Sequence, residues 1–159
     1  MYWYTVIMID KDTFLISDFT GVKGLIFFGE QILVFRRDTK TKNFPLKVDL
    51  PGGGKENNET PFETFAREVE EEFGLTVQRE DVIYSKKYPS IFDDTKIAFF
   101  VVTKSNTHKK ADVIFGDEGL EFFYTTPEEY ILLTDGIPQQ QIKVKDFLEA
   151  THPLATITR

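Results

Sequence analysis

The stretch GGGKENNETPFETFAREVEEEFGL, residues 52–75, carries the strongest structural signal in the chain. It opens with three consecutive glycines, and a segment with so few side chains predicts an irregular loop. A helix is predicted over residues 61–73, because Thr60 and Glu63 form a capping pair and Pro61 suits the first helical position. The stretch therefore predicts a glycine loop followed closely by a well-defined helix.

The charges of this helix are unevenly placed. Its apolar side chains recur at helical spacing and form one stripe centred near Val69. Glu68, Glu71 and Glu72 fall on a neighbouring face, and Arg67 is the only basic residue of the helix. Carboxylates this close repel one another, and a bound cation would relieve that repulsion. Oxygen ligands of this kind suit Mg²⁺ or Mn²⁺ rather than zinc or copper.

The glycines before the helix supply complementary chemistry. Backbone without side chains approaches phosphate oxygens closely, or offers a carbonyl oxygen to a metal ion. Glycines beside clustered carboxylates therefore indicate phosphates that a cation bridges to the protein. A plain loop and a solvated helix face are the alternative interpretations of these two features.

The spacing of these residues resembles the signature of the Nudix hydrolase family, of the MutT-like kind. The chain matches that signature at every defined position. The match consists of Gly53, then Glu59 after five intervening residues, then the run Arg67–Leu75 after seven more. The match covers Gly53–Leu75 directly. The resemblance implies an α/β protein, an α/β/α sandwich in which helices flank a mixed sheet, and residues 1–159 are expected to form a single Nudix hydrolase domain.

The resemblance also implies the metal-binding and catalytic residues. Glu68, Glu71 and Glu72 correspond to the metal-binding glutamates of the family, and the carbonyl of Gly52 corresponds to a further metal ligand. The backbone at Gly53 is expected to contact substrate. The implied cofactor is Mg²⁺, with Mn²⁺ as the other candidate.

Other residues correspond to supporting or substrate-binding positions. Arg67 resembles the family arginine that orients the carboxylates, and Glu59 resembles its salt-bridge partner. Arg37 ends a predicted strand where family members often place an arginine that contacts phosphate. Arg36 is its neighbour, and the alternation of a strand places only one of the two on the inner face.

The implied reaction is attack of water on phosphorus, with a carboxylate removing the proton. Family members differ in the glutamate that acts as the base. Glu68 corresponds to one choice, and Glu118 or Glu121 in a later loop correspond to the other. Glu118 is preferred, because its flanking glycines indicate a loop near the ligand.

Several substrates fit this pattern. The first is a nucleoside triphosphate or another nucleoside diphosphate derivative, cleaved by a Mg²⁺-dependent pyrophosphohydrolase. ADP-ribose or a nucleotide sugar is the alternative, because Pro89 lies where ADP-ribose-type members carry a proline.

A nucleotide-sensing module without catalysis would be expected to lose a metal glutamate, and this chain keeps all of them. An enzyme for RNA 5′ ends would need a basic channel, for which the candidates are Lys40, Lys42, Lys47, Lys86 and Lys87.

Composition limits the remaining possibilities. The net charge of −7 argues against a nucleic-acid partner and leaves a small nucleotide-type substrate as the expected partner. Cysteine is absent and there are only two histidines, so carboxylates must carry any metal chemistry. Without a predicted leader or membrane span, a cytoplasmic location is expected. Dimers are common among the proteins it resembles, so a homodimer is one expected state.

Strands and helices outside the helix at 61–73 are expected from apolar and β-branched runs. The expected strands are Tyr2–Ile9, Gly24–Phe28, Ile32–Arg37, Val82–Tyr88, Lys96–Thr103 and Glu121–Tyr124, and the expected helices are Pro127–Leu133 and Gln139–Ala150.

Overall fold

The computed structural model describes residues 8–151, so most of the predicted strand Tyr2–Ile9 lies outside the described residues. Within that range seven strands form one mixed sheet in the order β3-β2-β1-β6-β5, with β4 beside β1 and β7 beside β2. The strands are β1 (Gly21–Phe28), β2 (Gln31–Arg37), β3 (Val48–Asp49), β4 (Gly52–Gly54), β5 (Val82–Pro89), β6 (Ile97–Lys104) and β7 (Gly119–Thr125).

The first two strands form a hairpin that opens away from its turn. They pair antiparallel only at Phe27–Ile32 and Phe28–Gln31. Farther from the turn, β1 pairs with β4 and β2 pairs with β3, while the other edge of β1 runs parallel to β6. The sheet is therefore split between β1 and β2, and the short strands β3 and β4 lie in the split.

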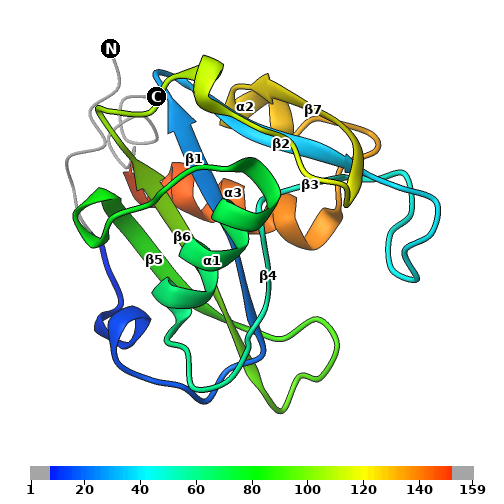
Figure 1. Ribbon diagram of the computed structural model, residues 1–159. Coiled ribbons are helices and arrows are strands. Elements are labelled where there is room, and N and C mark those ends of the chain that lie inside the picture. The colour runs from blue at the N-terminus through cyan, green and yellow to red at the C-terminus, as the bar shows by residue number, and fades with distance from the viewer. Residues whose placement is uncertain (1–7, 152–159) are drawn as a thin grey trace, which may run out of the picture.

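Two long helices cover the two faces of the sheet, as Figure 1 shows. Helix α1 (Pro61–Phe73) packs on one face and buries Phe65 against it. Helix α3 (Pro138–Thr151) packs on the other face through Phe147. Successive side chains of a strand point to opposite faces of the sheet, so each strand contributes side chains to both hydrophobic cores. In β1, for example, Leu25 and its neighbour Ile26 belong to different cores. The expected sandwich of helices around a mixed sheet is confirmed.

Helix α1 forms for the local reasons that the sequence indicates. The Thr60 side chain accepts a hydrogen bond from the backbone N–H of Glu63, and the Glu63 side chain accepts one from the backbone of Thr60. Gly74 ends the helix in the left-handed conformation, with φ of 68°. The shorter elements are the 3₁₀ turns Lys11–Phe14, Arg79–Asp81 and Lys110–Asp112 and the single-turn helix α2 (Pro127–Tyr130).

Two expectations from the sequence are corrected. The glycines at 52–54 form strand β4 instead of an irregular loop, because the missing side chains allow the chain to lie against β1. At Gly52, where φ is +133°, a Cβ atom would lie 2.1 Å from the carbonyl oxygen of Val22. The helix expected over Pro127–Leu133 is shorter and ends at Tyr130. Among residues 8–151, no helix is long and apolar enough to cross a membrane.

Candidate active site

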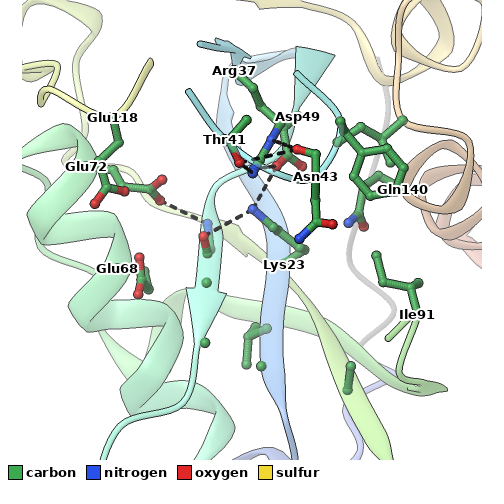
Figure 2. A pocket seen from close by; sticks show the side chains of 18 of the residues that line it. Lys23, Arg37, Thr41, Asn43, Asp49, Glu68, Glu72, Ile91, Glu118 and Gln140 are labelled. Atoms are coloured by element: carbon green, nitrogen blue, oxygen red, sulfur yellow. Dashed lines mark hydrogen bonds and ion pairs between the residues drawn. The ribbon is translucent and has the colours of Figure 1, made fainter. Parts of the chain in front are cut away.

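A large pocket lies where β1 and β2 separate. Its volume is about 880 Å³, and α1, β4, the loop at residues 38–47, the loop at residues 90–96 and α3 all contribute to its lining. Figure 2 shows acidic side chains from α1 on one side of the pocket and Gln140 from α3 on the other. The pocket thus joins segments that are far apart in the sequence.

The acidic wall of the pocket consists of Glu68, Glu71 and Glu72 from α1. Strand β4 lies directly against these side chains. The backbone N–H of Gly52 donates a hydrogen bond to Glu72 Oε1 at 3.1 Å. At Gly53, a Cβ atom would lie 2.5 Å from the carboxylate carbon of Glu68. The absence of side chains on β4 therefore leaves room for the carboxylates.

Arg67 connects the helix to its surroundings through hydrogen bonds. It donates to Glu59 at 2.7 Å, to Glu68 at 3.0 Å and to the carbonyl of Gly54 at 2.8 Å. A longer contact of 3.3 Å reaches Glu71. The hydrogen bond between Arg67 and Glu59 raises the pKa of the guanidinium and lowers the pKa of the carboxyl. This network fixes the position of the acidic wall relative to β4.

Burial changes the titration of two of these glutamates. Burial raises the pKa of Glu72 to about 8, although the charge of Lys23 and the N–H of Gly52 act in the opposite direction. Burial also raises the pKa of Glu68, and the charges of Glu71 and Glu118 add to the effect, against the lowering by Arg67. The negative charge of these carboxylates is therefore only partly compensated by the protein.

The donor chemistry of this wall fits a divalent cation. Carboxylate oxygens and the carbonyl of Gly52 are the hard ligands that Mg²⁺ and Mn²⁺ prefer. Within residues 8–151 no three acidic or histidine side chains already converge as a complete metal site. The reason is visible in the contacts, since Glu68 is turned toward Arg67 and Glu72 toward Gly52.

A basic cluster adjoins this wall in the pocket, on the other side of Gly52, and it is built around the buried carboxylate of Asp49. Lys23 Nζ lies 2.9 Å and Arg37 Nη1 lies 2.8 Å from Asp49 Oδ2. Lys23 also donates to the carbonyl of Gly52 at 3.2 Å, and Arg37 donates to the Thr41 hydroxyl at 2.6 Å. Sequence reasoning missed Lys23 and Asp49, because only the pairing of strands brings them together.

The structure separates the two neighbouring arginines. Arg37 lines the pocket, whereas Arg36 donates hydrogen bonds to Glu121 at 2.8 Å and to Asp135 at 2.7 Å outside the pocket lining. Glu118 also lines the pocket, beside the acidic wall in Figure 2. Arg36 and its partner Glu121 are therefore the two predicted site residues that lie away from the pocket and from the residues that support it.

Comparison with known proteins agrees with this geometry. The family model of the NUDIX domain matches residues 20–147, which is most of the chain. The chain belongs to the NUDIX domain family. It is a hydrolase that acts on phosphorus-containing acid anhydrides, and members of this family generally use a divalent metal. No curated protein matches the sequence.

Solved structures share the NUDIX fold with this chain. A MutT protein from Methanosarcina mazei Go1 is 23% identical with a TM-score of 0.68, covering 86% of this chain and 97% of that one. An Ap4A hydrolase from C. elegans is 17% identical with a TM-score of 0.61, covering 80% and 94%. A bifunctional NMN adenylyltransferase/ADP ribose pyrophosphatase from Francisella tularensis, complexed with AMP and a Mn ion, is 18% identical with a TM-score of 0.55, covering 90% and 41%.

The contact between Gly53 and Glu68 generates a prediction. In Gly53→Ala the added methyl group displaces the Glu68 carboxylate, and Mn²⁺ affinity measured by titration calorimetry is expected to fall about 10- to 100-fold. Gly54→Ala is the matched control, because a Cβ atom there meets nothing within 4 Å. Equal Mn²⁺ affinity in the two variants would show that the Glu68 position is irrelevant to metal binding.

Proposed function

We propose that this NUDIX protein is a Mg²⁺-dependent pyrophosphohydrolase that cleaves a phosphate anhydride bond in a nucleoside triphosphate or another nucleoside diphosphate derivative. One observation carries the proposal. A wall of carboxylates and a cluster with Lys23 and Arg37 lie next to each other in the lining of one pocket. A polyphosphate chain would suit this lining, because a cation held by the carboxylates would neutralise some of its phosphates and the lysine and arginine would neutralise others.

Glu68, Glu71, Glu72 and the carbonyl of Gly52 would hold the metal. When bound, a divalent cation lowers the pKa of a coordinated water and neutralises charge on the anhydride oxygens. Arg67 keeps Glu68 and Glu71 on the pocket side of the helix through its hydrogen bonds.

Glu118 is the proposed general base. It lines the pocket, and its charge is close enough to Glu68 to raise the pKa of that carboxyl. Gly116 holds the start of its loop, because the backbone N–H of Gly116 donates to the carbonyl of Glu72 at 2.8 Å. Glu121 is less suited to the role, since it is engaged with Arg36 outside the pocket lining. The base would accept the proton of the attacking water as the water oxygen bonds to phosphorus, while the bond from phosphorus to the bridging anhydride oxygen breaks and that oxygen leaves with the departing phosphate group.

The other substrate classes receive less support. ADP-ribose or a nucleotide sugar is the second candidate, since a pocket of about 880 Å³ accommodates a second ribose or sugar. A sensing module without catalysis is disfavoured by the complete set of glutamates. A channel for RNA is disfavoured because Lys86 pairs with Asp146 and Lys87 pairs with Asp12.

The role of the acidic wall is tested by removing single charges. Glu72→Gln or Glu71→Gln is expected to abolish Mg²⁺-dependent turnover with an unchanged circular dichroism spectrum, because an amide neutralises the ligand and keeps its shape. Glu70→Gln is the control on the exposed side of the helix and is expected to retain full activity. Full activity in both the Glu71 and the Glu72 variants would refute the metal assignment.

The assignment of the base is tested by comparing two neighbouring glutamates. Glu118→Gln is expected to lower kcat by roughly 10²- to 10⁴-fold, the usual contribution of a general base. Glu121→Gln is expected to lower it only slightly, because Glu121 contacts Arg36. A loss below about tenfold for Glu118→Gln removes Glu118 from this role.

The substrate class is tested with a panel of nucleoside triphosphates, nucleotide sugars, ADP-ribose and dinucleoside polyphosphates, each assayed with Mg²⁺. Release of pyrophosphate or phosphate from a nucleoside triphosphate is expected at the highest kcat/KM. Faster cleavage of ADP-ribose or a nucleotide sugar would replace the first candidate by the second. No turnover of any member of the panel would overturn the proposed activity.

A further inference from the structure

The start of helix α3 forms one end of the pocket. Ile137, which precedes the helix, and Gln140 and Lys143 within it all line the cavity, and Gln140 lies on the side away from Glu68 and Glu72 (Figure 2). Gln140 and Lys143 are three residues apart, so their side chains share one face of the helix. The backbone N–H groups in the first turn of a helix carry a partial positive charge, which suits a negative group at this end of the pocket.

The ammonium group of Lys143 is buried and has no anionic partner. Lys143 is only 5% exposed, and its side chain makes no hydrogen bond or ion pair with the part of the chain that the structure describes. Its Nζ lies 5.4 Å from the centroid of the Tyr88 ring. Burial lowers the pKa of Lys143 to about 8, the charge of Lys23 lowers it further, and the charge of Asp49 raises it. The group is therefore mostly protonated at neutral pH, and a buried charge without a counterion is unfavourable.

The carboxylate of Asp49 does not neutralise Lys143, because two other cations share it. Asp49 Oδ2 lies 2.9 Å from Lys23 Nζ and 2.8 Å from Arg37 Nη1. Among these four groups, three cations therefore stand against one carboxylate. A neutral ligand would leave the excess of positive charge in place, whereas an anionic ligand would compensate it.

Gln140 adds a second polar group without a partner. It is 3% exposed, and its Oε1 is buried and accepts no hydrogen bond from residues 8–151. The adjacent Gln141 differs, because its Nε2 donates to the carbonyls of Tyr130 and Leu133 at 3.0 and 2.8 Å. A half-turn of the Gln140 amide places its NH₂ group where Oε1 lies, and that group donates to an anion. A buried amide without partners is unusual, and a ligand bound beside Lys143 would account for it.

Lys23 connects this end of the pocket to the acidic wall. Its charge lowers both the pKa of Glu72 and the pKa of Lys143, so it lies close enough to act on both groups. A phosphorylated ligand that lies along Lys23 would therefore hold one phosphoryl group near the carboxylates of α1 and another near Lys143.

We propose that Lys143, Gln140 and the first turn of α3 form an anion site that binds a phosphoryl group of the substrate, in addition to the phosphates bound beside the acidic wall. The oxygens of that group accept hydrogen bonds from the ammonium and amide groups, and its charge compensates the buried cation. The inference rests on the proposed function, and it narrows the substrate to one with a second phosphoryl group at this distance. That group is either the far phosphate of a polyphosphate chain or a separate phosphate, such as one on the ribose.

The first test measures ligand binding by titration calorimetry in the presence of Mg²⁺. The ligands are a methylene-bridged inorganic triphosphate, a nucleoside 3′,5′-bisphosphate and the corresponding 5′-monophosphate. Lys143→Met is expected to weaken binding of the triphosphate or of the bisphosphate about 10- to 100-fold, the effect of losing a charge-assisted hydrogen bond in a buried site. A loss for the triphosphate identifies the chain as the source of the anion, and a loss confined to the bisphosphate identifies the separate phosphate.

Two further variants serve as controls for this measurement. Lys143→Arg keeps a charged donor and is expected to retain most of the affinity. Lys145→Met removes an exposed lysine from the same helix and is expected to change nothing. A loss below about threefold for both the triphosphate and the bisphosphate in Lys143→Met would overturn the proposal. So would an equal loss for the bisphosphate and the monophosphate with the triphosphate unaffected, because it would assign Lys143 to the nucleoside.

The second test separates a binding role from a structural one. Lys143→Met removes an unpaired buried charge, so its temperature of thermal unfolding is expected to rise while its affinity for the anion falls. A lower unfolding temperature together with weaker binding would give Lys143 a structural role and overturn the proposal. Gln140→Leu is expected to weaken the same ligand about 3- to 10-fold, with the exposed Gln139→Leu as its control. Unchanged affinity in Gln140→Leu would overturn the part of Gln140 in the site.

The outcomes separate this inference from the proposed function. Binding of the triphosphate or the bisphosphate that depends on Lys143, without turnover of any nucleotide, would remove the proposed hydrolytic reaction and leave the anion site. Turnover of nucleotides with unchanged KM and unchanged ligand affinity in Lys143→Met would have the opposite meaning. The same protein preparations serve both measurements.

Discussion

The close contact between strand β4 and helix α1 is the constraint on which the site depends. The N–H of Gly52 holds Glu72, Gly53 leaves space for the Glu68 carboxylate, and Arg67 reaches back to the carbonyl of Gly54. Any side chain on the first two glycines would collide with the backbone of β1 or with a carboxylate. The acidic face of the helix is therefore kept at the pocket surface by a strand that has no side chains of its own.

The second structural condition is the split between β1 and β2. If the hairpin paired along its whole length, no cavity would lie between the strands. The entry of β3 into the split brings Asp49 between Lys23 and Arg37, and this buried carboxylate fixes both cations. The result is a pocket with negative charge along α1 and positive charge beside it, where Lys23 and Arg37 lie. These two regions are the basis for the proposed binding of a cation and of the phosphates of a substrate.

Local signals in the sequence predicted the parts of the molecule that depend on local forces. The helix at 61–73, its Thr60 cap and its Gly74 end follow from capping and periodicity, and the structure reproduces them. The mixed sheet between helices was also predicted. The prediction was wrong for the glycines at 52–54, because propensity describes how a segment behaves alone and does not include a neighbouring strand that accepts it.

The sequence by itself determined the NUDIX family, the acidic helix face and the residues that support it, because all of these lie within one continuous stretch whose spacing is set by helix geometry. Only the tertiary structure decided that Arg37 lines the pocket while Arg36 does not, and that Asp49 fixes Lys23. It also placed Gln140 and Lys143 at the far end of the same cavity. Those relations depend on strand register and on the packing of α3 across the sheet, which join separate segments of the chain and leave no periodic pattern along it.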